Sequence, residues 1–290
     1  MKNLFLLFFL LIGFSACEKP IILDDDESLT DGEANLVVSV HTIETIPFSS
    51  GMSRAAVTDR CTRLNFAVYD SLNTRVKQIN QVVGDKDFGI ANFNLDPGKY
   101  RVVVVAHSSN GNPTMTNPAK IQFKNSQGFT DTFMSNDTVV VGESAVTLPV
   151  NIRRIVSLCR FVVTDAVPQN VAQMRFQYKG GSGAFDAATG FGSVNSTQTE
   201  FFPVEAGQDS TVYDLYTFLH AAEGTIHLQA TAYDENDQVL RDREFDIPLK
   251  RRMVTKFSGP YFSDASDPSS TISVIITFND DWEGEQVISY

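Results

Sequence analysis

Apolar and polar residues alternate with a period of two through most of the chain beyond residue 34. Leu36, Val38 and Val40 occupy one phase of the first such segment, and the same alternation returns in residues 63–69, 226–233 and 272–278. Neighbouring side chains of a strand point to opposite faces of its sheet, so this pattern is typical of strands with one buried face. No segment keeps an apolar stripe at helical spacing over three turns, although residues 214–222 fit a short helix as well as a strand. The pattern predicts an all-β protein built from antiparallel sheets.

Turn signals divide the strands into two sets. The segment Asp96-Pro97-Gly98-Lys99 is a strong turn, because proline presets φ at its second position and glycine tolerates a positive φ at its third. It leads into residues 100–106, which are apolar on both faces and therefore predict a central strand. A second set begins near residue 153, with strands expected over residues 155–164, 174–178 and 238–249. Since 290 residues are more than one compact core usually holds, we expect two β-sandwich domains, residues 34–151 and 152–290.

The first residues form an export signal. A short basic start, an apolar run over residues 4–14 and the small pair Ser15-Ala16 are typical of a secretory signal peptide. The run is shorter than the roughly 20 apolar residues that span a bilayer. Cys17 follows directly, and the segment resembles a bacterial lipobox, apart from Phe14 where leucine is usual. The resemblance implies a signal peptide over residues 1–16 and a lipid on Cys17; an ordinary signal peptide with a chance cysteine is the alternative.

Residues 17–33 are polar and acidic, which suits a lipidated, flexible tether. The run Asp24-Asp25-Asp26-Glu27 resembles the surface-export signal of Bacteroidota lipoproteins, although it starts later after the cysteine than usual. A charge run is also typical of a solvated spacer. The resemblance implies an outer-membrane protein held by lipid at the cell surface.

The net charge of −12 excludes one class of partner, because an acidic surface without a basic cluster repels phosphate backbones. We therefore expect no nucleic-acid binding. Beyond Cys17 the chain has Cys61 and Cys159. Cys159 lies on an apolar strand face, whereas Cys61 has the alternation phase of an outward or neighbour-facing residue. We favour two unpaired thiols over a disulfide, although the sequence leaves the pairing open.

Residues with catalytic or metal-binding chemistry are scattered. The four histidines, His41, His107, His220 and His227, have no metal-ligand spacing. Residues 180–183 are rich in glycine but match neither a nucleophile elbow nor a phosphate loop, and residues 234–238 fit a hairpin turn better than a calcium loop. Trp282, the single tryptophan, stands among acidic residues and is expected to pack rather than bind. We predict no enzyme activity, no cofactor and no metal site.

Three Asp-Ser/Thr triplets resemble the acceptor motif for O-glycosylation in Bacteroidota. They place candidate acceptors at Ser71, Thr138 and Ser210. Each lies at an expected turn or strand end, where an Asx turn needs the same residues. Glycosylation and turn formation are both consistent with the motif.

Two further segments resemble a known family. Residues 95–104 contain a Pro-Gly-x-Tyr hairpin like those of transthyretin-like sandwiches, and residues 150–161 are similar to the inter-domain strand of fimbrillin-type lipoproteins. With the lipobox and the acidic tether, the chain resembles the FimB-like fimbrillin and anchor lipoproteins of Bacteroidales type V fimbriae over nearly its whole mature length. The resemblance implies transthyretin-like domains, a lipid on Cys17 and no catalytic residues.

The resemblance also implies an assembly mechanism. Subunits of such fimbriae join by strand addition, in which one subunit's strand completes the open groove of another. Stalk subunits lose their first strand to an Arg-specific protease, whereas anchors keep the strand and the lipid. Here the first strand is expected over residues 36–46, and Arg54 and Arg60 are the possible cleavage sites after it. We favour the alternative that both are ordinary arginines of an exposed loop, where arginine is common.

We therefore expect an anchor or minor fimbrial subunit, joined to other subunits and to the outer membrane. A polymerising stalk or tip fimbrillin is one alternative, and cleavage at Arg54 or Arg60 distinguishes it. The other alternative is a surface glycan-binding lipoprotein of a polysaccharide-uptake system, which needs an exposed aromatic platform. Tyr69, Tyr233 and Trp282 are the candidates for that platform.

Overall fold

The computed structural model describes residues 33–44, 54–55, 60–205, 207–263, 275–277, 282 and 284–290. They form strands β1–β20 and one short 3₁₀ turn, η2 (Asn125–Gln127), with no α-helix among the described residues. The predicted all-β fold is confirmed. Within the same residues, no helix is long and apolar enough to cross a membrane.

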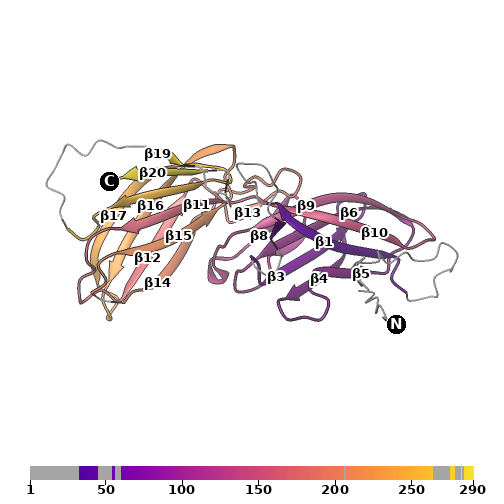
Figure 1. Cartoon of the computed structure of the whole chain (residues 1–290), viewed down its shortest axis with the longest axis horizontal. Helices are drawn as coiled ribbons and strands as arrows, with labels where there is room; N and C mark the ends of the chain where they lie inside the picture. Colours follow the sequence, from indigo (N-terminus) through magenta and orange to yellow (C-terminus); the bar gives the residue numbers. More distant parts are fainter. Residues whose placement is uncertain are drawn as a thin grey trace, which may run out of the picture.

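Two β-rich halves lie end to end (Figure 1). The N-terminal half is a curled sheet in the order β2-β1-β10-β9-β6-β3-β4, with β5 paired to β1. Its strands are β1 (Leu36–Glu44), β2 (Arg54–Ala55), β3 (Arg63–Tyr69), β4 (Arg75–Val82), β5 (Ile90–Phe93), β6 (Gly98–His107), β9 (Phe133–Val141) and β10 (Val146–Arg154). The predicted central strand is confirmed as β6, which lies between β3 and β9 with residues 102–106 buried. The inner face of this sheet encloses a mostly aliphatic core.

The C-terminal half has two sheets. One has the order β15-β11-β18-β20-β19 and the other β14-β12-β16-β17. Their strands are β11 (Ser157–Val163), β12 (Gln173–Lys179), β14 (Gln198–Pro203), β15 (Thr211–Thr217), β16 (Glu223–Tyr233), β17 (Val239–Lys250), β18 (Val254–Gly259), β19 (Ile275–Thr277) and β20 (Glu285–Ser289). The core between them is rich in aromatic rings, with Phe161 in tilted or edge-on contact with Phe176, Phe245, Phe257 and Tyr290. The second half therefore buries larger side chains than the first.

A small third sheet joins the halves. It consists of β7 (Thr114–Asn117), β8 (Lys120–Gln122) and β13 (Ala184–Phe185), so a strand of the C-terminal half completes a hairpin of the N-terminal half. Gly183 allows this approach, since its carbonyl accepts from Phe123 N at 2.9 Å and an added Cβ would lie 3.0 Å from the Phe129 ring. A third apolar cluster, from Met115 and Phe123 to Val156 and Phe218, fills the junction. The two halves thus share one buried core as well as having their own.

Several details differ from the sequence prediction. The expected boundary between residues 151 and 152 falls inside β10, which continues to Arg154 in the N-terminal sheet. Residues 211–217 are the strand β15, so the helical alternative for residues 214–222 is wrong. Most pairs are antiparallel as expected, but β1–β10, β11–β18 and β18–β20 are parallel. Strand β20 was not predicted at all.

Candidate functional site: the first strand and its groove

Strand β1 has one long neighbouring strand and two short ones. On one flank it runs parallel to β10 along its whole length, from Leu36 beside Val146 to Glu44 beside Arg153. On the other flank it meets the short strands β5 and β2. The N-terminal sheet therefore holds its first strand in a groove whose one wall, β10, is continuous and whose other wall is interrupted.

The inner face of β1 is buried. Leu36, Val38 and Ile43 are fully buried in the N-terminal core. A bulge between Val40 and Thr42 shifts the alternation by one residue, so the inward phase changes from even to odd positions. Each such side chain contributes about 1.5–3 kcal/mol when buried. Without β1, the groove would be an apolar trough between two unpaired strand edges.

Asn35 clips the start of β1 to the loop after β5. Its side-chain amide donates to Leu95 O at 2.6 Å, and its Oδ1 accepts from Leu95 N at 3.0 Å. Its backbone N donates to Phe93 O at 3.0 Å, and its O accepts from Val146 N at 3.0 Å. Sequence reasoning missed Asn35, because one asparagine before a strand carries no signal of a partner sixty residues away.

The direction of β1 follows from its parallel pairing. Because β10 runs towards the junction with the C-terminal half, Leu36 lies at the far pole of the N-terminal half and β1 runs towards the junction (Figure 1). The chain therefore enters the fold at the pole remote from the C-terminal half. Cys17 and the predicted signal peptide over residues 1–16 lie outside the described residues, as does the predicted tether over residues 17–33 except for residue 33.

The two candidate cleavage sites flank a segment that is mostly outside the described residues. Arg54 lies in β2, opposite Glu44 at the end of β1, and Arg60 lies in a turn just before β3. Both thus follow the first strand closely, as the sequence predicted, and cleavage at either stays a prediction.

The three candidate O-glycosylation sites are exposed. Ser71 lies in the β3–β4 turn, Thr138 on the outer face of β9 and Ser210 just before β15. At the first site the turn alternative is realised, since Asp70 Oδ1 accepts from Leu72 N at 2.9 Å and Thr74 N at 2.8 Å. Sugar attachment at any of the three stays a prediction.

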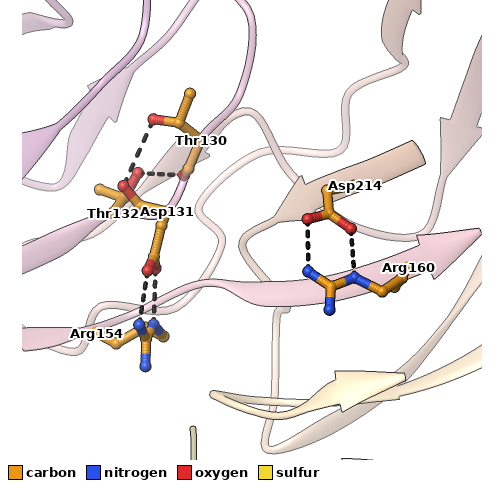
Figure 2. Close-up of polar contacts among 6 residues, drawn as sticks. All are labelled: Thr130, Asp131, Thr132, Arg154, Arg160 and Asp214. Atoms are coloured by element: carbon orange, nitrogen blue, oxygen red, sulfur yellow. Dashed lines mark hydrogen bonds and ion pairs between the residues drawn. The ribbon is translucent and has the colours of Figure 1, made fainter. Parts of the chain in front are cut away.

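Two guanidinium–carboxylate pairs lie along the line from β10 to β11 (Figure 2). Arg154, the last residue of β10, donates to both oxygens of Asp131 at 2.7 and 2.6 Å, and its guanidinium stacks 3.9 Å from the Trp282 ring centroid. Arg160 of β11 donates to both oxygens of Asp214 of β15 at 2.8 Å. Two-point pairs of this kind fix orientation as well as charge. Only Ile155 and Val156, both buried in the junction, separate β10 from β11.

A buried carboxyl group also crosses the junction. Glu200 of β14 accepts from Phe129 N of the N-terminal half at 3.2 Å and from Tyr178 Oη at 2.8 Å. Burial raises the pKa of Glu200 to about 7, although both hydrogen bonds favour its charged form. The contact between the halves therefore includes a group that titrates near neutral pH.

The three aromatic candidates for a glycan-binding platform, Tyr69, Tyr233 and Trp282, do not form one exposed surface. Tyr69 is fully buried and donates to Met115 O at 2.6 Å, so its predicted outward position is wrong. Trp282 is also buried and packs as predicted. Tyr233 is half-buried beside Arg175. The three rings belong to different elements, so they do not line one face of a sheet.

Histidines and cysteines form no reactive group in the described chain. Burial lowers the pKa of His107 to about 3, and its Nε2 contacts Asn65 Oδ1 at 2.8 Å. No set of three or more potential metal ligands gathers among the described residues. Cys61 and Cys159 are free thiols buried in different cores, and burial raises the pKa of Cys61 to about 12. Of the two orientations expected for Cys61, outward or towards a neighbour, the outward one is wrong, because Cys61 precedes β3 rather than continuing its alternation.

A polar hollow lies on the outer face of β12, β16 and β17. It has a volume of about 380 Å³, and its polar lining residues are Gln177, Lys179, His227, Gln229, Glu244 and Asp246. Sequence reasoning did not single it out, since these residues are ordinary outward positions of three separate strands. It offers hydrogen-bond donors and acceptors but no exposed aromatic ring among the described residues that line it.

Fold and site together define a class: an all-β module of two joined halves, with a deeply inserted first strand. The chain matches the family model of the fimbrillin-A associated anchor proteins Mfa1 and Mfa2 over residues 29–286 and belongs to this family. It is thus a fimbrial anchor-family protein associated with the cell envelope and not an enzyme, as predicted.

The solved structures that match the chain share little sequence with it. The fimbrial anchor protein Mfa2 from Porphyromonas gingivalis is 13% identical, with TM-score 0.42, covering 72% of this chain and 80% of that one. An adhesin candidate from Bacteroides ovatus is 14% identical, with TM-score 0.47, covering 73% and 76%. A fimbrial assembly protein from Parabacteroides distasonis is 14% identical, with TM-score 0.35, covering 80% and 91%. No curated protein matches the chain. The family match, and not these structures, carries the assignment.

Proposed function

We propose that this protein is the anchor or minor subunit of a type V-like fimbria, held in the outer membrane by a lipid on Cys17. Residues 17–33 act as its acidic tether, and other fimbrial subunits join it by strand addition. The single observation that supports an anchor is the seating of β1, which is clipped by Asn35 and buries Leu36, Val38 and Ile43. A subunit that keeps such a strand stays covalently joined to its lipid.

The polymerising stalk or tip fimbrillin is the alternative within the same family. Cleavage after Arg54 or Arg60 would separate β1 and the lipid from the rest of the chain. The groove beside β10 would then accept a strand from another subunit. In the anchor, by contrast, strand addition uses edges other than this groove.

N-terminal analysis of the protein from native outer membranes separates the two. Intact-mass and peptide mass spectrometry are expected to find a diacylglyceryl-modified Cys17. A Cys17→Ser variant is expected to leave the membrane fraction, with the fold unchanged. A new N-terminus at Ala55 or Cys61 would contradict the anchor and support the polymerising subunit. The same spectra test Ser71, Thr138 and Ser210, where added hexose mass is expected if the triplets are used.

Glycan binding is the second candidate, and the polar hollow on β12, β16 and β17 is the observation that favours it. Its amides and carboxylates match the hydroxyl groups of a sugar, although sugar sites usually also offer a ring to stack on. A glycan array would support this reading only if a hit is lost in Gln229→Ala and retained in Gln78→Ala on the opposite half. An array without hits leaves the fimbrial role as the sole function.

A further inference from the structure

We propose that the line β1–β10–β11 is the force-bearing axis of the molecule, and that β1 is loaded in shear. This inference rests on the proposed function, in which a lipid tether leaves the N-terminal half, and takes the other subunits to join the chain at its C-terminal half. The structure offers a route for that tension through named strands.

The first step is the place where tension enters. The tether joins β1 at Leu36, at the pole of the N-terminal half remote from the junction. Pulling on the tether away from the C-terminal half therefore pulls β1 along its own axis. Since β1 and β10 run parallel and are paired from Leu36 to Glu44 on both sides of one bulge, the hydrogen bonds between them oppose the pull together rather than one after another. The bulge at Val40 and Thr42 and the buried Ile43 also oppose sliding past β10.

The second step is transfer across the junction. From β10 the tension passes along the covalent backbone through Ile155 and Val156 into β11. Both residues are buried in the junction cluster, and Ile155 N donates to Thr132 O at 3.0 Å. Arg154 ties the end of β10 to Asp131, and Arg160 ties β11 to Asp214 (Figure 2). The two pairs fasten the axis to its neighbours on either side of the junction.

The third step is distribution in the C-terminal half. β11 is flanked on both sides, by β15 from Ser157 to Val163 and by β18 from Leu158 to Val163. The aromatic core packs against its inner face through Phe161. Because β11 has a full-length neighbour on each side and β1 has only one, β1 is expected to slip first.

Single-molecule force spectroscopy tests this with two pairs of handles on the full chain carrying Cys17→Ser. In the axial geometry, one handle is attached at Glu33→Cys and the other at Glu235→Cys. Glu235 lies in the exposed β16–β17 turn at the far pole of the C-terminal half. That turn is at the far pole because the opposite end of β17 leads to Arg252, whose N donates to Val156 O at the junction. In the peeling geometry, the handles are attached at Glu33→Cys and Glu143→Cys. Glu143 lies in the β9–β10 turn, close to Leu36 at the start of β1. The buried Cys61 and Cys159 stay unlabelled in the folded protein, because burial raises their thiol pKa values.

Both geometries release the same segment, between residue 33 and the start of β3, and extend the chain by up to roughly 100 Å. The expected rupture force is about two- to threefold higher in the axial geometry, since forced unfolding follows the barrier along the pulled direction. Equal forces, or a first axial rupture within the C-terminal half, would overturn the inference. This outcome is independent of the proposed function, whose failure is a mature protein without lipid on Cys17.

Discussion

Strands β1 and β11 each open one half of the molecule, and each runs parallel to a late strand of its sheet. They differ in what holds them. β11 lies inside its sheet with a long neighbour on both flanks and packs on an aromatic core, whereas β1 has one long neighbour, two short ones and an aliphatic core. A strand in the first position can therefore be either a permanent part of the core or a separable element, depending on its neighbours. The predictions below test that difference.

The largest effect is expected in the aromatic core around β11. Phe161→Ala should lower the free energy of unfolding by about 3–5 kcal/mol, because it removes a ring that packs against five others. Guanidinium unfolding measured by circular dichroism checks this. Phe201→Ala is the matched control, since that ring is 56% exposed, and it should change stability by less than about 0.5 kcal/mol.

A smaller loss is expected from the matching change in β1. Leu36→Ala should cost about 2–4 kcal/mol, since Leu36 is fully buried but lies near the end of its strand. Trp282 fluorescence provides the second readout, because this single tryptophan lies at the junction. If β1 can separate on its own, the N-terminal core of the Leu36→Ala variant should open first. The circular-dichroism signal should then change before the tryptophan fluorescence does. Simultaneous loss of the circular-dichroism and fluorescence signals would show that β1 unfolds together with the rest of the chain, as β11 is expected to. Val140→Ala, an exposed position of the same sheet, is the control.

The junction between the halves should respond to pH through Glu200. Its folded pKa of about 7 lies above the ordinary value of 4.5, so the folded state binds the proton more tightly than the unfolded chain. The residue therefore lowers stability as pH rises from about 4.5 to 7, on the order of 3 kcal/mol in full. Urea unfolding at several pH values should show this slope in the natural protein and not in Glu200→Gln. A slope that persists in the variant would assign the pH dependence to other groups.

The clip at the start of β1 is expected to contribute about 1–2 kcal/mol. Asn35→Ala leaves Leu95 N and Leu95 O without their side-chain partner in a buried place. Hydrogen exchange at Leu36–Val38, followed by mass spectrometry, should rise in this variant. Asn151→Ala provides the comparison, because Asn151 also hydrogen-bonds across β1 but is exposed. Equal effects of the two changes would remove the special role of Asn35.

The smallest effect is expected at the Arg160–Asp214 pair. Arg160→Lys keeps the charge but loses the two-point geometry, and both side chains are partly exposed. The expected loss is below about 1 kcal/mol at equilibrium. A double-mutant cycle with Asp214→Asn measures the coupling. A coupling well above this value would mean that β11 depends on the pair as much as on its aromatic core.

Sequence reasoning succeeded where one strand carries its own pattern. The alternation at Leu36 and Val38 and the hairpin turn at Asp234 were both found, the latter closed by Asp234 N donating to Gln238 O at 3.1 Å. The turn expected over residues 96–99 is a bend at Pro97, with β6 beginning at Gly98. It failed where a position depends on a distant partner. Arg154 looked like the start of the second half but belongs to the first sheet, because β10 pairs with β1 and β9.

Short strands at the junction were also missed. β8 and β13 have three and two residues, too few to show a period, and they pair only because the folded halves bring them together. The candidate site divides in the same way. The first strand and the arginines after it were predicted, whereas the Asn35 clip and the Glu200 contact were not. Their partners, Leu95 and Phe129, lie sixty and seventy-one residues away.

The amino-acid sequence by itself determined the β-class of this protein and the family to which it belongs. The β-class follows from local signals, since a period of two or a turn needs no distant partner. Only the tertiary structure decided that β1 runs parallel to β10, that the halves share a core, and which carboxyl and arginine groups meet at the junction. The physical reason is that pairing partners and burial are set by non-local contacts, whose free energy exists only when the whole chain is folded.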